Sequence, residues 1–338
     1  MNIRDIARLS GVGVSTVSRV LNNHPDVKES TRKKVLEVIK ESNYIPNNSA
    51  RILKQNNTKN IGVLVKGVFN PFFSEMITVI GNKIEENKYT MILQQNDYAL
   101  GQDVDLLVSF IKEKRLQGII CLGGNFTDID EDSFLNIDVP IVITSVNNIS
   151  NKGKENYSTV GIDDVKSSYN ATEYIINKGH KNIAMMIGEK NDFGISWWRY
   201  KGFVKALEKH GLESNRDNVL IGDYSPSVAY EEAKKYLMEN KDTTAIFAIS
   251  DRMAIGVAKA VSDLGLVVGK DISIVGFDGL EESEFYTPGI TTVKQPKKEL
   301  ATQSVELLFD LLKGEKNNEH IILDTNLVER ESCNSIKR

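Results

Sequence analysis

The sequence has 338 residues, of which 41% are hydrophobic and 26% are charged. This length predicts about two to three domains or subdomains, and the composition is ordinary for a globular protein with a sizeable core. The N-terminus is polar and charged, and no stretch approaches the about 18 apolar residues of a membrane helix, so we expect a cytoplasmic protein without a membrane partner. Cys121 and Cys333 are the only cysteines, which argues against a disulfide framework.

Charge is distributed unevenly along the chain. The formal net charge is −4, but residues 1–59 carry 11 Lys and Arg against 5 Asp and Glu, whereas the remainder carries 31 against 41. A small basic N-terminal part on an acidic body is typical of a protein that attracts phosphate groups through one domain. A chance distribution over a solvated surface is the alternative.

The first two predicted helices make a helix-turn-helix. Helical spacing predicts a helix over Ile3–Leu9, which Gly11 can end because glycine readily adopts the left-handed conformation. A second helix is predicted over Val14–Leu21, with apolar residues inward and polar residues outward. The inward residues are Val17, Val20 and Leu21, and the outward ones are Ser15, Thr16, Ser18 and Arg19. Small polar side chains on such a helix reach base edges in the major groove, so the pattern predicts DNA reading, with an ordinary helical hairpin as the alternative.

A third amphipathic helix, rich in basic residues, is predicted over Glu29–Ser42. The following segment Asn48–Lys54 could form only two turns, too few for a helix to hold alone in water. The whole run resembles the lactose-repressor (LacI/GalR) family of bacterial regulators. The residues that carry the resemblance are Ile3-x-Asp5-Ile6-Ala7, Thr16-Val17-Ser18-Arg19-Val20-Leu21-Asn22, Tyr44-x-Pro46-Asn47 and Ala50-Arg51-x-Leu53.

This resemblance implies a helix-turn-helix domain over 1–47 and a hinge helix and linker over 48–59. Val14 and Ser15 would set the choice of operator, and Val14 can press on a thymine methyl group. Leu53 would wedge between base steps in the minor groove. We expect the hinge to be disordered in the free protein and helical when two copies meet on DNA, with a passive linker as the alternative. The expected DNA contacts are Val14, Ser15, Thr16, Arg19, Asn22, Arg51 and Leu53.

From Ile61 onward, short apolar runs alternate with amphipathic stretches of helical spacing. This alternation predicts parallel sheets with helices on both faces, and about ten strands are too many for one compact sheet, so we expect two doubly wound lobes. The predicted strands are Ile61–Val65, Thr90–Gln95, Gly118–Leu122, Ile141–Val146, Val160–Asp163, Ile183–Gly188, Val219–Gly222, Ala245–Ser250, Ile272–Phe277 and Thr291–Lys294.

The body is similar to the type I periplasmic-binding-protein fold that the same family uses as its sensor. The similarity rests on Asn70-Pro71-Phe72-Phe73, Gly179-His180-x-x-Ile183-Ala184, Arg199-x-x-Gly202-Phe203, Asp251-x-Met253-Ala254-x-Gly256 and Gly276-Phe277-Asp278. It implies a ligand-binding and dimerisation domain over 60–338. Lobe one would comprise about 60–159 and 290–319, lobe two about 160–289 and 320–338, with three crossings of the chain between them.

Ligands of open α/β lobes bind at the carboxyl ends of the strands, which here means between the lobes. Phe72 and Phe73 follow the first strand and could stack on a sugar, although core packing explains a single Phe as well. Trp197 and Arg199 are expected in a loop after the strand Ile183–Gly188. By the resemblance, Arg199 hydrogen-bonds the ligand, for which its five-donor fork is suited; an ordinary surface Arg is the alternative.

The remaining ligand candidates follow later strands. They are Ser145, Tyr224, Ser250, Asp251 and Asp278. Carboxylates accept hydrogen bonds from sugar hydroxyls, although Asp251 could instead cap the following helix. Ser250 and Ser145 stand where many family members have Asn and Asp. At both positions the polar side chain is shorter than in those family members. The ligand of a known family member therefore does not predict the ligand of this protein.

Enzymatic chemistry finds little support in the sequence, because the four histidines have no zinc spacing and there is no nucleophile elbow or phosphate-binding loop. We therefore expect a DNA-binding repressor controlled by a small ligand, most plainly a sugar, without a cofactor. Two half-sites of an operator imply a homodimer. The alternatives are control by a phosphoprotein corepressor, and a cytoplasmic sugar-binding protein without a regulatory role.

Overall fold

The computed structural model describes residues 1–21, 24–42, 44, 59–66, 70–96, 103–124, 126, 129–134, 137–146, 153–189 and 194–336. The chain divides into two compact units, Met1–Thr58 and Lys59–Arg338, which we describe separately. Asn22, Arg51, Leu53 and the expected hinge helix lie outside the described residues. Among the residues that are described, no helix is long and apolar enough to span a membrane.

The N-terminal unit packs α1 (Ile3–Ser10), α2 (Val14–Leu21) and α3 (Glu29–Glu41) around a small core. Asn2 begins α1 with a capping box, in which its side chain accepts from Asp5 N while the Asp5 carboxylate accepts from Asn2 N. Gly11 ends the helix with a φ of 65°. The fully or nearly fully buried residues of this core are Ile6, Ala7, Val17, Val20 and Val35.

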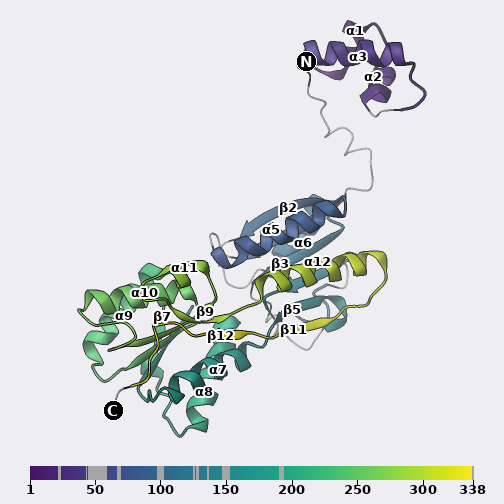
Figure 1. The fold of residues 1–338 in the computed structure, drawn as a ribbon. Helices are drawn as coiled ribbons and strands as arrows, with labels where there is room; N and C mark the ends of the chain where they lie inside the picture. The colour runs from purple at the N-terminus through teal and green to yellow at the C-terminus, as the bar shows by residue number, and fades with distance from the viewer. Residues whose placement is uncertain are drawn as a thin grey trace. The chain divides into compact units, whose positions relative to one another are not determined.

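The first sheet of the C-terminal unit has the strand order β11-β5-β4-β3-β1-β2, and all neighbouring strands are parallel (Figure 1). Its strands are β1 (Asn60–Lys66), β2 (Thr90–Asn96), β3 (Gly118–Leu122), β4 (Ile141–Thr144), β5 (Ser158–Ile162) and β11 (His320–Leu323). The helices of this half are α5 (Pro71–Glu86), α6 (Asp103–Lys114) and α12 (Lys297–Lys313). α12 packs beside α5 over this sheet.

The second sheet has the order β12-β10-β9-β8-β6-β7, in which β12 alone among the described strands is antiparallel to its neighbour. Its strands are β6 (Ile183–Ile187), β7 (Val219–Ile221), β8 (Ala245–Ala248), β9 (Ser273–Asp278), β10 (Thr291–Lys294) and β12 (Asn326–Val328). Its helices are α7 (Asp164–Asn177), α8 (Ile195–Lys209), α9 (Pro226–Glu239), α10 (Asp251–Asp263) and α11 (Glu281–Phe285). α7 packs on α8, and α9 packs on α10 (Figure 1).

Continuous burial of the strands explains this architecture. Every residue of β3 and β9 is buried, which is typical of parallel strands with helices on both faces. The connections β6-α8-β7 and β7-α9-β8 run in opposite directions along the sheet, so right-handed crossovers place their helices on opposite faces. The predicted fold class, a helical head with a two-lobed doubly wound body, is confirmed.

The two sheets do not follow the expected lobe boundaries. Residues 290–319 are expected in lobe one, and α12 does pack on the first sheet, but β10 pairs with β9 in the second sheet. Residues 320–338 and Val160–Asp163 are expected in lobe two, and β12 does join the second sheet, but β11 and β5 pair with each other in the first sheet. The apolar pattern of a buried strand predicts the strand but does not specify the sheet that it joins. The expected points at which the chain crosses between the lobes were therefore displaced by one strand.

Candidate functional site

A cavity of about 90 Å³ in the C-terminal unit is lined from both sheets. Its lining residues follow the carboxyl ends of the strands or begin the next helices, the position expected for a ligand of open α/β lobes. The described lining residues are Lys66, Asn70, Phe72, Phe73, Gly123, Gly124, Ser145, Glu189, Ile195, Arg199, Tyr224, Ile249, Asp278 and Gln295.

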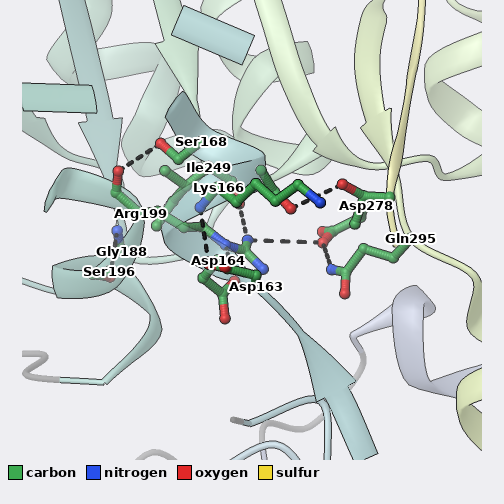
Figure 2. Close-up of polar contacts among 12 residues, drawn as sticks. Asp163, Asp164, Lys166, Ser168, Gly188, Ser196, Arg199, Ile249, Asp278 and Gln295 are labelled. Carbon is green, nitrogen blue, oxygen red and sulfur yellow. Dashed lines mark hydrogen bonds and ion pairs between the residues drawn. The ribbon is translucent and has the colours of Figure 1, made fainter. Parts of the chain in front are cut away.

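Arg199 is the central cation of this cavity (Figure 2). It lies in the first turns of α8 and not, as we expected, in a loop. Its Nε donates to Asp164 Oδ1 over 2.8 Å, and its NH1 donates to the Ile249 carbonyl over 2.7 Å. The guanidinium also lies 3.6 Å from the ring centroid of Phe277. These contacts fix the guanidinium plane in a side chain that is only 4% exposed.

Asp278, at the end of β9, lies beside Arg199 in the cavity lining, and an ion pair joins the two side chains (Figure 2). Its Oδ1 lies 4.0 Å from Arg199 NH1 and accepts a hydrogen bond of 2.9 Å from Gln295 Nε2. Burial raises the pKa of this carboxyl to about 7, although the nearby guanidinium of Arg199 acts in the opposite direction. Gln295 Oε1 is buried and accepts no hydrogen bond within the described part of the chain. The pair therefore presents polar atoms to the cavity.

Aromatic rings form the apolar part of the wall. Asn70 caps α5 through a hydrogen bond from Phe72 N, which directs Phe72 and Phe73 inward with their rings edge to face. The Tyr224 hydroxyl lies 3.0 Å from Ser196 Oγ. Aromatic faces together with a few fixed polar groups are the usual lining of a small-molecule site.

Three lining residues have an unusual backbone. Ser145, Tyr224 and Asp278 have φ angles of 64°, 48° and 114°, in a region that residues other than glycine rarely adopt. Strained backbone of this kind clusters at ligand sites, where the surrounding fold holds it in place. The strain supports the location of the site at these strand ends.

Three of our ligand candidates do not line the cavity. Trp197 is 40% exposed and stacks on Tyr200 outside it, because successive helix residues point about 100° apart and Arg199 takes the inward direction. Ser250 begins α10 without lining the cavity. Asp251 is fully buried and accepts from Leu280 N and Thr292 Oγ1, so it neither faces the cavity nor caps α10.

Several lining residues were not foreseen from the sequence. Lys66 ends β1 and forms a buried ion pair of 2.6 Å with Asp103 at the start of α6. Gln295 and Glu189 follow β10 and β6. A polar residue at or directly after the end of an apolar strand is the pattern that indicates Asp278, and Lys66 and Gln295 show the same pattern.

On the N-terminal unit, α2 displays the expected DNA-reading residues. Val14 is 42% exposed, Ser15 and Arg19 are exposed, and Thr16 is half-buried, while Val17 and Val20 face the core. An exposed valine at the start of a helix has no packing role, so its position suits a contact outside the domain.

Comparisons with known proteins agree with both units. Residues 2–47 match the family model of bacterial regulatory proteins of the lacI family. Residues 172–333 match the model of the periplasmic binding protein-like domain. The chain is also similar in structure to the transcriptional regulator CelR–cellobiose complex, with a TM-score of 0.71 and 26% identity over 98% of this chain and 99% of that one.

Relatives and further structures cover nearly the whole chain. The HTH-type transcriptional regulator MalR of Clostridium butyricum is 65% identical over 99% of this chain and 100% of its own length. The HTH-type transcriptional repressor PurR of Pasteurella multocida is 35% identical over 98% of each. The lac repressor dimer bound to operator and the anti-inducer ONPF matches with a TM-score of 0.76 and 25% identity over 98% of each chain. The chain therefore belongs to the lacI family of bacterial regulatory proteins: it is a helix-turn-helix transcriptional regulator with a ligand-binding domain, and not an enzyme.

Proposed function

We propose that this protein is a repressor that binds a near-palindromic operator as a homodimer and responds to a sugar bound in the cavity. The observation that carries the proposal is the combination of Arg199 and Asp278 with the rings of Phe72, Phe73 and Tyr224 around one cavity. A sugar offers hydroxyl groups to both a donor and an acceptor, and its apolar ring face suits an aromatic wall. The similar CelR structure is a complex with cellobiose.

The two lobes connect the cavity to DNA in this proposal. Arg199 belongs to the second lobe and Phe72 and Phe73 to the first, so a bound sugar contacts both. Its binding would change the spacing of the two first lobes in the dimer and thus the pairing of the segments 48–59. Such a shift requires that the sugar bind the two states with different affinity.

A DNA-binding titration with the full chain tests this function. Operator fragments are first selected from random DNA by the protein, and their binding is then followed by fluorescence anisotropy with and without sugars, including cellobiose, maltose and glucose. We expect nanomolar binding of the selected DNA and a change of at least about tenfold with one of the sugars, which corresponds to about 1.4 kcal/mol of coupling. Equal affinity for selected and random DNA would contradict the DNA-reading role. An operator affinity that none of these sugars changes would contradict the proposal that the effector is a sugar.

A further inference from the structure

Lys66 forms part of the wall between two neighbouring cavities. It lines the large cavity, and together with Asp103, Cys121, Phe126 and other residues it lines a second one of about 10 Å³. Its side chain is 10% exposed, and its Nζ lies 2.6 Å from the Asp103 carboxylate, which is 5% exposed. The lysine thus brings a positive charge to the wall of the large cavity, with its counter-ion behind it.

A buried ion pair at this place is not needed to hold the fold together. Taking two charges out of water offsets most of their attraction, so a well-packed apolar pair would stabilise the fold at least as well. The neighbours Leu64, Cys121 and Phe126 would suit such an apolar pair. Because Lys66 lines the cavity, its charge can act in the recognition of an effector.

Carboxylates outnumber cations in and directly behind the described lining of the large cavity. Two of its described lining residues are cations, and each has its own buried carboxylate: Lys66 has Asp103, and Arg199 has Asp164 within 2.8 Å. The described lining itself adds Glu189 and Asp278. A phosphate monoester carries about −1.5 to −2 charges. Its transfer from water into this cavity would cost desolvation free energy, and no unpaired cation of the described lining would offset that cost. A neutral polyol meets no such penalty.

We propose that Lys66, positioned by Asp103, is a specificity-determining residue through which the cavity selects an uncharged effector over a phosphorylated one. This inference rests on the proposed function, since it concerns the effector of the same cavity. The Lys66 ammonium donates a hydrogen bond to an oxygen of the effector. The Asp103 carboxylate neutralises the positive charge of Lys66, so that this charge does not attract an anion. Removal of the Asp103 charge alone should then allow an anion to pair with Lys66 in the cavity.

Thermal unfolding in phosphate and in chloride, at equal pH and ionic strength, tests the inference with inorganic phosphate as the probe. In Asp103→Asn the charge of Lys66 is uncovered, so phosphate should raise the midpoint by at least about 2 °C relative to chloride. The double variant Asp103→Asn/Lys66→Met and the wild type should each shift by less than about 1 °C. If Asp103→Asn does not fold, Asp103→Ser uncovers the same charge and leaves room for an anion.

The exposed pair of Lys83 and Glu306, with 2.8 Å between Nζ and Oε1, supplies the matched control. Glu306→Gln removes a lysine-bound carboxylate on the same lobe and should leave the phosphate response at the wild-type value. A shift of about 2 °C or more in the double variant or in the wild type overturns the inference, as does the absence of such a shift in Asp103→Asn. Stabilisation of the wild type by glucose 6-phosphate to the same extent would also overturn it. These melts involve no DNA, so a failure of sugar-controlled operator binding is seen separately in the titration described above.

Discussion

Arg199 Nε donates to Asp164 Oδ1 over 2.8 Å, and this pair joins the second turn of α8 to the first turn of α7 with both side chains buried. The side chain that we expected to serve a ligand is therefore also a structural tie between two helices.

Arg199→Ala should lower the free energy of unfolding by about 3–5 kcal/mol, because Asp164 would lose its cationic partner in a buried place. Urea denaturation measures the loss. The matched control is Lys209→Ala, which breaks the exposed ion pair with Glu173 between the same two helices and should change stability little. Equal stability of both variants would show that the buried Arg199–Asp164 pair contributes no more to stability than the pair of Lys209 and Glu173.

Asp278→Asn should change how stability depends on pH. Burial raises the pKa of Asp278 to about 7, so its contribution to stability is present below its unfolded pKa of about 4 and is lost as the pH rises through 7. The Asn side chain of the variant does not ionise, so the free energy of unfolding of the variant does not fall in this pH range for this reason. The Asn side-chain oxygen can still accept the hydrogen bond from Gln295 Nε2. The stability of the variant relative to the wild type should therefore rise from pH 5 to pH 8 in urea denaturation. Parallel pH curves of the two proteins would rule this out.

Asp251 should matter for folding and not for effector binding. Its carboxylate accepts from Leu280 N and from Thr292 Oγ1, each over 2.6 Å, and it does not line the cavity. Asp251→Ala should destabilise the fold by about 1.5–3 kcal/mol for each hydrogen bond lost. A double-mutant cycle with Thr292→Val isolates the side-chain pair. A loss of effector affinity without a loss of stability would restore the role that the sequence suggested.

Exchange of Val14 and Ser15 should alter the operator sequence that the protein prefers more than its affinity for random DNA. Both side chains are exposed on α2, and contacts to base edges specify sequence, whereas contacts to phosphates do not. Selection of DNA by the exchanged variant, followed by titration against both operators, measures the change. Equal losses on operator and random DNA would show that these residues do not read bases.

Leu53→Ala tests the proposed hinge. The segment is too short to be helical alone, and Leu53 is expected to enter the minor groove once two copies meet on DNA. The variant should bind operator more weakly and bend it less, as seen in gel-mobility bending assays, with unchanged effector affinity in the free protein. Wild-type bending and affinity would eliminate the hinge-helix mechanism.

The sequence by itself determined the fold class and most of the secondary structure. Apolar spacing located α2 from Val14 to Leu21 and β3 from Gly118 to Leu122, both with their observed bounds. Local physics explains this success, because a helix buries one face with a period of 3.6 and a covered parallel strand is apolar throughout. The strands β11 and β12 were missed because they lie at sheet edges, where every residue of both strands is exposed or half-buried and the apolar signal is weak.

Only the tertiary structure decided which side chains meet. Arg199 and Asp278 belong to elements far apart in the chain, and their separation of 4.0 Å depends on the register of several strands between them. Trp197 and Arg199 are two residues apart, yet the rotation of α8 turns one to the surface and the other to the cavity. The ion pair of Lys66 with Asp103 and the bonds of Asp251 arise in the same way. Sequence patterns fix the inward face of each element, whereas contacts between distant elements follow from their packing.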